Sequence, residues 1–138
     1  MLPTQKTLVQ QSFTKILPIR ERVGESFYAR LFEVDPSLRP LFKGDLKVQA
    51  KALMGMIQTA VNGLDNLEKL VPAVQDLGKR HKDYGVKPEH YDTVGNALLW
   101  TFGKHLGPEF TPEVKAAWGA AYTVLATTMK AAAYAESE

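Results

Sequence analysis

Residues 67–81, with the sequence LEKLVPAVQDLGKRH, decide the class of fold because their apolar side chains recur with the spacing of a helix. Leucine or valine stands at positions 67, 70, 74 and 77, in steps of three, four and three residues, so these side chains share one helical face. Four residues further along the same face stands His81. A lone histidine on an apolar stripe is more often a buried side chain with a backbone partner than a metal ligand, and periodicity leaves both interpretations open.

Helical spacing of this kind, interrupted by Pro, Gly and Asp, continues through most of the chain. The breaks predict about six or seven helical segments, at roughly 4–17, 19–34, 36–42, 47–62, 67–84, 88–106 and 112–133, followed by a fraying tail from Tyr134 to Glu138. Asp35-Pro36 and Thr111-Pro112 each combine a capping residue with a first-turn proline. The chain is therefore predicted to be all-α, and both a four-helix bundle and a globin-like stack fit this pattern.

Length and composition exclude several classes of function. The 138 residues are the usual length of one domain, here 1–138. Lys and Arg number 17 against 15 Asp and Glu, an excess too small and dispersed for a nucleic-acid partner. The absence of cysteine excludes disulfides, thiolate metal sites and a thiol nucleophile. No apolar run reaches the roughly 18 residues of a membrane span and the N-terminal segment is polar, so we expect a cytoplasmic protein without a signal peptide.

Three other polar side chains also continue apolar faces. Gln49 lies one helical turn before Leu53, Tyr28 lies one turn before a Leu-Phe pair, and Tyr91 lies on the stripe that continues to Phe102. Taken singly, each is better explained as a core or boundary residue whose polar end reaches the surface. Together with His81 they indicate a polar site inside a helical core.

Two kinds of metal site fit such a helical domain. In a haem site a single imidazole binds the iron, and polar donors face a diatomic ligand. A carboxylate-rich metal site needs several inward acidic residues with Glu-x-x-His spacing, which the chain does not contain. His-x-x-x-His is also missing, so zinc is unsupported. His105 can reach the core as well as His81, and periodicity does not choose between them.

With these residues placed, the chain resembles the globins over nearly its whole length. Within that family it is most similar to bacterial single-domain haemoglobins of the flavohaemoglobin type, and its C-terminal half is also similar to neuroglobin-like sequences. The blocks that carry the resemblance are, in chain order, Phe27-Tyr28 with Leu31-Phe32, Asp35-Pro36 with Phe42, Gln49-Ala-Lys-Ala-Leu53-Met54, Leu77-Gly-Lys-Arg-His81, Tyr84-Gly-Val86, His90-Tyr91 with Val94-Gly95 and Leu98-Leu99, and Leu106-Gly107-Pro108 with Phe110-Thr111-Pro112, Trp118 and Tyr122.

The resemblance implies a globin fold of about six to eight helices around a non-covalently bound haem b with its iron. It also assigns roles to individual residues, with His81 rather than His105 as the proximal iron ligand. The other implied roles are Phe42 against the haem face, Leu53 over the gas ligand, Tyr28 and Gln49 as distal hydrogen-bond donors, Val86 as a haem contact and Arg80 as a propionate partner.

One position departs from the family pattern. Globins of this type place a glutamate in the last helix, beside the proximal histidine and the tyrosine that matches Tyr91. Counted from Trp118, that position is Ala133 here, and Glu136 lies three residues further on. Without the carboxylate, His81 gains less imidazolate character, so peroxidase-like chemistry is expected to be weaker and the role of Tyr91 is in doubt.

The resemblance implies reversible binding of O2, with NO and CO as further ligands, and two functions follow from it. The first is nitric oxide dioxygenation, which needs an external reductase because these residues leave no space for a flavin domain. The second is oxygen storage, delivery or gas sensing without turnover. Tyr28 and Gln49 favour the first, because two donors stabilise the negative charge on bound dioxygen and a carrier has to release its ligand. A monomer and a homodimer are both compatible with the sequence.

Overall fold

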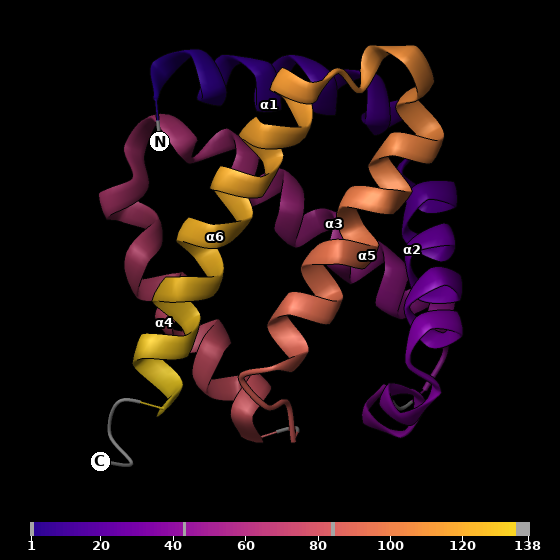
Figure 1. The fold of residues 1–138 in the computed structure, drawn as a ribbon. Helices are drawn as coiled ribbons and strands as arrows, with labels where there is room; N and C mark the ends of the chain where they lie inside the picture. Colours follow the sequence, from indigo (N-terminus) through magenta and orange to yellow (C-terminus); the bar gives the residue numbers. More distant parts are fainter. Residues whose placement is uncertain (1, 43, 84, 135–138) are drawn as a thin grey trace.

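The structure is a computed structural model that describes residues 2–42, 44–83 and 85–134. Its six α-helices are α1 (Pro3–Ile16), α2 (Arg20–Val34), α3 (Leu46–Asn62), α4 (Leu67–Asp83), α5 (His90–Leu106) and α6 (Pro112–Tyr134) (Figure 1). Short 3-10 helices join them: η1 (Leu17–Ile19), η2 (Pro36–Leu41), η3 (Leu64–Asn66) and η4 (Gly107–Glu109). The described residues contain no strand, which confirms the all-α prediction. No described helix has the length and apolarity needed to cross a membrane.

Local hydrogen bonds explain where two of the segments begin. Asp35 accepts from the Ser37 N–H at 3.1 Å, which caps η2, and Thr111 accepts from the Val114 N–H at 3.2 Å, which caps α6. Both caps are the ones that the sequence predicts.

The helix predicted to open at Pro88 starts two residues later, at His90. The reason is that the Lys87 N–H donates to the His90 ring at 3.0 Å and stabilises a turn before the helix. The expectation of fraying at Tyr134 is also wrong, because this residue is the last of α6 and is half-buried. Tyr84 and residues 135–138, including Glu136, lie outside the described residues.

The helices that carry the predicted site are held by different neighbours. α2 packs against both α3 and α5, whereas α4 packs along α6, and α1 crosses α6 near its N-terminal end. In Figure 1, α5 and α6 lie in front with α3 behind them, and α2 and α4 stand on opposite sides. The arrangement places Tyr28 on α2 and Gln49 on α3 in one group of packed helices, and His81 on α4 in the other.

The buried side chains divide in the same way. A large cluster, which includes Phe27, Tyr28, Phe102 and Trp118, joins α1, α2, α3, α5 and the first half of α6. A smaller cluster is centred on Tyr91, Ala126 and Met129, and Val74, Leu77, Val86, Tyr122 and Tyr134 pack against it. Tyr122 packs against both clusters and connects them.

Two glycines allow the closest helix contacts. A Cβ at Gly24 would lie 2.9 Å from the Ala50 Cβ, where α2 meets α3, and a Cβ at Gly78 would lie 2.7 Å from the Met129 Cα, where α4 meets α6. Real Cβ atoms do not approach other atoms so closely, so any larger residue would push the helices apart. Tyr28 follows Gly24 by one turn and His81 follows Gly78 by three residues, so both contacts position the predicted site.

Candidate functional site

The site is bordered on one side by an aromatic cluster from α2 and the residue after η2. The ring of Tyr28 lies 5.2 Å from Phe42 and 5.9 Å from Phe32, and Phe32 lies 5.5 Å from Phe42, measured between ring centroids. Phe27 meets Tyr28 edge-on at 5.0 Å. Centroid separations of about 4.5–7 Å in tilted or offset geometry are favourable aromatic contacts. They fix the orientation of the Tyr28 ring.

The Tyr28 hydroxyl keeps its proton and has no hydrogen-bond partner among the described residues. Its side chain is only 5% exposed, and burial raises the pKa of Tyr28 to about 12. The hydroxyl is therefore a neutral hydrogen-bond donor throughout the physiological pH range. A donor of this kind, held in apolar surroundings, is suited to a ligand that carries partial negative charge.

Gln49 and Leu53 lie one turn apart on α3 and are both half-buried. Gln49 directly precedes Ala50, which meets Gly24 of α2, so Gln49 stands at the crossing of the two helices. Leu53 packs against the large cluster that contains Tyr28 and Phe42. The structure thus brings Tyr28, Phe42 and Leu53 into one cluster, with Gln49 on the adjoining turn.

His81 lies on α4, and its ring is oriented by the helix itself. Its Nδ1 lies 2.8 Å from the Leu77 carbonyl oxygen, a contact in which Nδ1–H donates and Nε2 keeps a free lone pair. Burial lowers the pKa of His81 below its usual 6.5; the Leu77 hydrogen bond opposes this effect and Arg80 adds to it. The imidazole is therefore neutral at pH 7. A neutral ring with one nitrogen bonded to a carbonyl is the arrangement in which histidine binds metals.

Two other predicted or competing side chains are engaged elsewhere. The Nε2 of His105 lies 2.9 Å from the Ser26 hydroxyl on α2, so this ring is used in a contact between α5 and α2. Arg80 is exposed and forms an ion pair with Asp76 at 3.1 Å on the same helix. The role of Arg80 toward a haem propionate therefore stays a prediction.

Tyr91 lies on α5 in the smaller buried cluster, against which Leu77 of α4 also packs, and its hydroxyl has no partner among the described residues. Tyr91 is 5% exposed, and its hydroxyl is the one fully buried side-chain polar atom without a partner in the described part of the chain. Burial and the neighbouring Tyr134 raise the pKa of Tyr91 to about 12. Ala133, where the family has a glutamate, is buried and has no side-chain acceptor to offer.

Val86 connects the segment after α4 to the end of α6. Val86 is half-buried, its N–H donates to the His81 carbonyl at 3.1 Å, and its own carbonyl accepts from the Tyr134 hydroxyl. It packs against the smaller cluster that contains Tyr91 and Leu77. Two hydrogen bonds thus hold the chain immediately beyond His81.

The side chains present fit a haem. α4 contributes only Gly78 to the fully buried residues, although its apolar stripe is the most regular in the chain. Apolar side chains on both groups of helices stay half-buried, namely Leu70, Val74 and Leu77 on α4, Leu53 and Ile57 on α3, and Phe32 and Phe42 beside them. Incompletely covered apolar surface and one neutral imidazole suit a largely apolar iron macrocycle, and the two polar donors suit a gas ligand bound to it.

Sequence reasoning missed two residues of this region, Tyr122 and Tyr134, as site residues. The Tyr122 hydroxyl donates to the Tyr91 carbonyl at 2.6 Å, and the Tyr134 hydroxyl donates to Val86. The four-residue steps from Trp118 to Tyr122 and Ala126 place Tyr122 on a buried face, which is the signal that could have found it. Tyr134 carries no such signal, because the polar residues that follow it suggest a chain end.

The chain is similar to known proteins over most of its length. The family model described as Globin matches residues 25–129. The chain is 35% identical over 117 residues to a flavohemoprotein of Bacillus subtilis (strain 168), covering 80% of this chain and 29% of the relative. It is 38% identical over 109 residues to a flavohemoprotein of Rhodopirellula baltica, covering 77% and 27%, and 35% identical over 131 residues to one of Xylella fastidiosa (strain 9a5c), covering 93% and 33%.

The all-α fold together with the matching family model and relatives identifies a haem-binding protein. The chain belongs to the globin family, and its cofactor is haem with iron. It spans about a third or less of the length of the flavohemoproteins it matches.

Tyr91→Phe and Tyr122→Phe test the hydrogen bonding around the smaller cluster. Tyr91→Phe removes a buried hydroxyl without a partner and should raise the free energy of unfolding by about 1 kcal/mol. Tyr122→Phe removes a hydrogen bond and should lower it by about the same amount. Urea unfolding of protein prepared without haem, followed by helical circular dichroism, measures both. Equal destabilisation by the two variants would show that the Tyr91 hydroxyl has a partner.

Proposed function

We propose that this globin holds dioxygen and uses it to oxidise nitric oxide to nitrate, with electrons from a separate reductase. The observation that carries the proposal is Tyr28, whose side chain is 5% exposed and whose hydroxyl is protonated and has no hydrogen-bond partner among the described residues. A protonated hydroxyl held among aromatic side chains is suited to donate a hydrogen bond to a ligand that carries partial negative charge. Gln49 adds an amide donor on the neighbouring turn of α3.

We assign the haem to the half-buried apolar side chains of α3 and α4, with Phe42 and Leu53 on the side of Tyr28 and Val86 on the side of His81. When bound, haem iron supplies the position at which a diatomic gas is held and oxidised or reduced. His81 presents its Nε2 lone pair, because its Nδ1–H is held by the Leu77 carbonyl. The lowered pKa of His81 keeps this lone pair available down to pH values below 6.5.

The distal donors make the gas ligand slow to leave. Tyr28 donates O–H and Gln49 donates N–H toward a ligand with partial negative charge, in a region of low dielectric constant. A hydrogen bond to a charged partner contributes about 1.5–3 kcal/mol. Two such bonds slow dissociation by about 100-fold or more, since about 1.4 kcal/mol corresponds to a factor of ten. A long-lived complex favours reaction with a second gas molecule over delivery.

The electron for each turnover comes from outside the described residues, which form only the globin helices. We therefore assign it to a separate reductase that works with this globin in the cytoplasm. The relatives are about three to four times as long as the matched region, and their name, flavohemoprotein, supports a redox role for this globin with a separate partner.

A second candidate function is oxygen storage, delivery or gas sensing, and the side of His81 favours it. The partner of His81 Nδ1 is a neutral carbonyl, and Ala133 stands where the family has a carboxylate. A neutral acceptor gives the imidazole less electron-donating character than a carboxylate. This feature suits reversible binding better than chemistry that breaks an oxygen–oxygen bond.

Reaction with nitric oxide distinguishes the two functions. Reduced, haem-loaded protein equilibrated with air should convert added nitric oxide to about one nitrate per haem, and a reductase with its electron source should sustain further turnover. Rapid mixing followed by optical spectra and nitrate analysis measures this. Release of oxygen without nitrate formation would favour storage or sensing.

Tyr28→Phe tests the distal donor. Loss of the hydroxyl should raise the oxygen dissociation rate at least about tenfold, because one hydrogen bond of more than about 1.4 kcal/mol is lost. The rate is measured by mixing the oxygen-loaded protein with excess carbon monoxide. Tyr122→Phe, which removes a hydroxyl that donates to the Tyr91 carbonyl, is the matched control. An unchanged rate in Tyr28→Phe would remove Tyr28 from the site.

His81→Ala tests the assignment of the iron ligand. This variant should lose stable haem binding, seen as loss of the haem absorption band after gel filtration, and added imidazole should restore part of it. His105→Ala should retain haem, because its ring contacts Ser26 instead. The assignment would be wrong if normal haem ligation survived in His81→Ala.

A further inference from the structure

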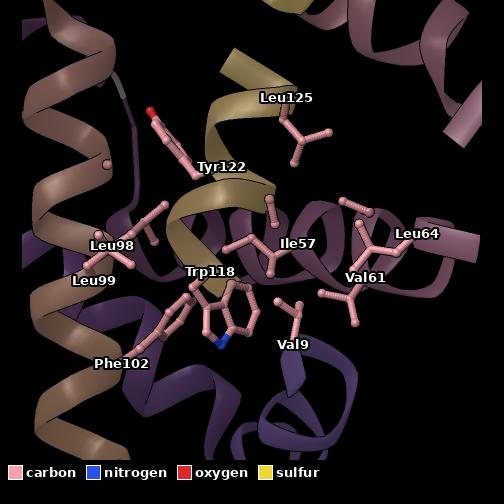
Figure 2. A pocket seen from close by; sticks show the side chains of 13 residues that line it. Val9, Ile57, Val61, Leu64, Leu98, Leu99, Phe102, Trp118, Tyr122 and Leu125 are labelled. Carbon is pink, nitrogen blue, oxygen red and sulfur yellow. The ribbon is translucent and has the colours of Figure 1, made fainter. Parts of the chain in front are cut away.

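The buried aromatic rings of this globin include two groups that are held in place by different means. One group borders an apolar cavity of about 60 Å³ among α1, α3, α5 and α6, and Figure 2 shows its rings Phe102, Trp118 and Tyr122. The Trp118 Nε1–H donates to the Ser12 hydroxyl at 2.8 Å, and the Tyr122 hydroxyl donates to the Tyr91 carbonyl at 2.6 Å. Polar atoms on the rings themselves therefore orient two members of this group.

The second group is the aromatic cluster around Tyr28, and its phenylalanines have no polar side-chain atom that could orient them. Phe32 and Phe42 are both half-buried, and both contact the Tyr28 ring, at centroid separations of 5.9 and 5.2 Å. Phe42 stands in extended backbone directly after η2, so no α-helix holds its backbone. Contacts from outside the rings must hold Phe42 against Tyr28.

Arg39, on η2, bonds to Phe42 at both polar groups of its backbone. The Phe42 N–H donates to the Arg39 carbonyl at 3.1 Å, and the Arg39 Nη1–H donates to the Phe42 carbonyl at 2.7 Å. The second bond has a charged donor, which makes it stronger than a bond between neutral groups. Together the two bonds restrict rotation of the backbone that carries the Phe42 ring.

The same guanidinium group lies over the ring of Phe32. The Arg39 Cζ is 5.4 Å from the Phe32 ring centroid, within the distance of about 6 Å at which a cation is attracted to an aromatic face. Phe32 in turn packs against Phe42 at a centroid separation of 5.5 Å. Arg39 therefore contacts both phenylalanines and can act on the Tyr28 ring through them.

We infer that Arg39 is a positioning residue of the distal side, which holds Phe42 and Phe32 and so sets the direction in which the Tyr28 hydroxyl donates. The inference rests on the proposed role of Tyr28 as a donor to the gas ligand. It requires no contact between Arg39 and the ligand. A planar guanidinium can lie over a ring and donate to a carbonyl at the same time, and the ammonium group of lysine has no such plane.

Arg39→Met tests the inference, because methionine keeps an unbranched apolar chain and lacks both the donor and the charge. The readout is the C–O stretching frequency of carbon monoxide bound to the reduced, haem-loaded protein, measured by infrared absorption. A hydrogen bond donated to the bound gas lowers this frequency, so Tyr28→Phe should raise it. Arg39→Met should also raise it, by less, and should raise the oxygen dissociation rate about threefold, because the donor is displaced but still present.

Arg30→Met is the matched control, because Arg30 makes the same two kinds of contact away from Phe32 and Phe42. Its Nη1 lies 2.7 Å from a Glu33 carboxylate oxygen, and its guanidinium lies 4.4 Å from the centroid of the Trp100 ring. The control loses comparable contacts but should keep the C–O stretching frequency of the unmodified protein. An equal shift in Arg30→Met would show a general effect of lost surface contacts and would overturn the inference.

Ring-proton NMR of the same carbon monoxide complex measures the positioning directly. Resonances of Phe42 and Tyr28 should shift in Arg39→Met and stay in place in Arg30→Met. If Arg39→Met does not bind haem, Arg39→Lys is measured instead, because it keeps the charge and lacks the planar group.

The two infrared results separate this inference from the proposed function. A raised frequency in Tyr28→Phe, with the frequency and the ring resonances unchanged in the Arg39 variant, would overturn the inference and leave Tyr28 as the donor. An unchanged frequency in Tyr28→Phe would contradict the role of Tyr28 in the proposed function, and the inference would fall with it.

Discussion

The contact between α4 and α6 at Gly78 is the constraint on which the position of His81 depends. Gly78 is the one fully buried residue of α4, so the register of α4 against α6 is set where this glycine meets the backbone of Met129. His81 follows three residues later, and the Leu77 carbonyl that orients its ring comes from the turn before. The helix therefore carries the ring and the acceptor that fixes its tautomer as one unit, and α6 places that unit.

Burial then keeps both sides of the site uncharged by opposite effects on two kinds of group. Tyr28 loses hydration that its phenolate would need, so its pKa rises, and His81 loses hydration that its imidazolium would need, so its pKa falls. The Tyr28 hydroxyl keeps its proton and can donate to a polarised gas. The His81 ring stays neutral and can bind a metal. Burial is the largest cause of both pKa shifts, and Arg80 adds to the lowering of the His81 pKa.

The sequence predicts the helices, which depend on local residue spacing, and the site residues that match motifs of the family. It does not predict features that depend on packing between distant residues. Helical periodicity places His81 on an apolar face, but only the resemblance to globins separates it from His105, because both lie near helix ends. In the structure the His105 ring contacts Ser26 from a distant part of the chain, and the role of His81 as the iron ligand stays a prediction. The start of α5 at His90 depends on a side-chain hydrogen bond, and the order at Tyr134 depends on a contact with Val86, 48 residues earlier. The apolar cavity depends on side-chain volumes from four helices, which no local pattern contains.

The Tyr134 hydroxyl donates to the Val86 carbonyl, and this hydrogen bond links the C-terminal end of α6 to the segment beside His81. A tag or fused domain attached beyond residue 134 is connected to α6, and the last side chain of this helix is hydrogen-bonded to the backbone next to His81. In fusion proteins built with this globin, the N-terminal end is therefore the better place to attach another domain. The N-terminal end of α1 begins at Pro3, on a helix that carries none of the assigned residues, and load applied there reaches the site only through the core.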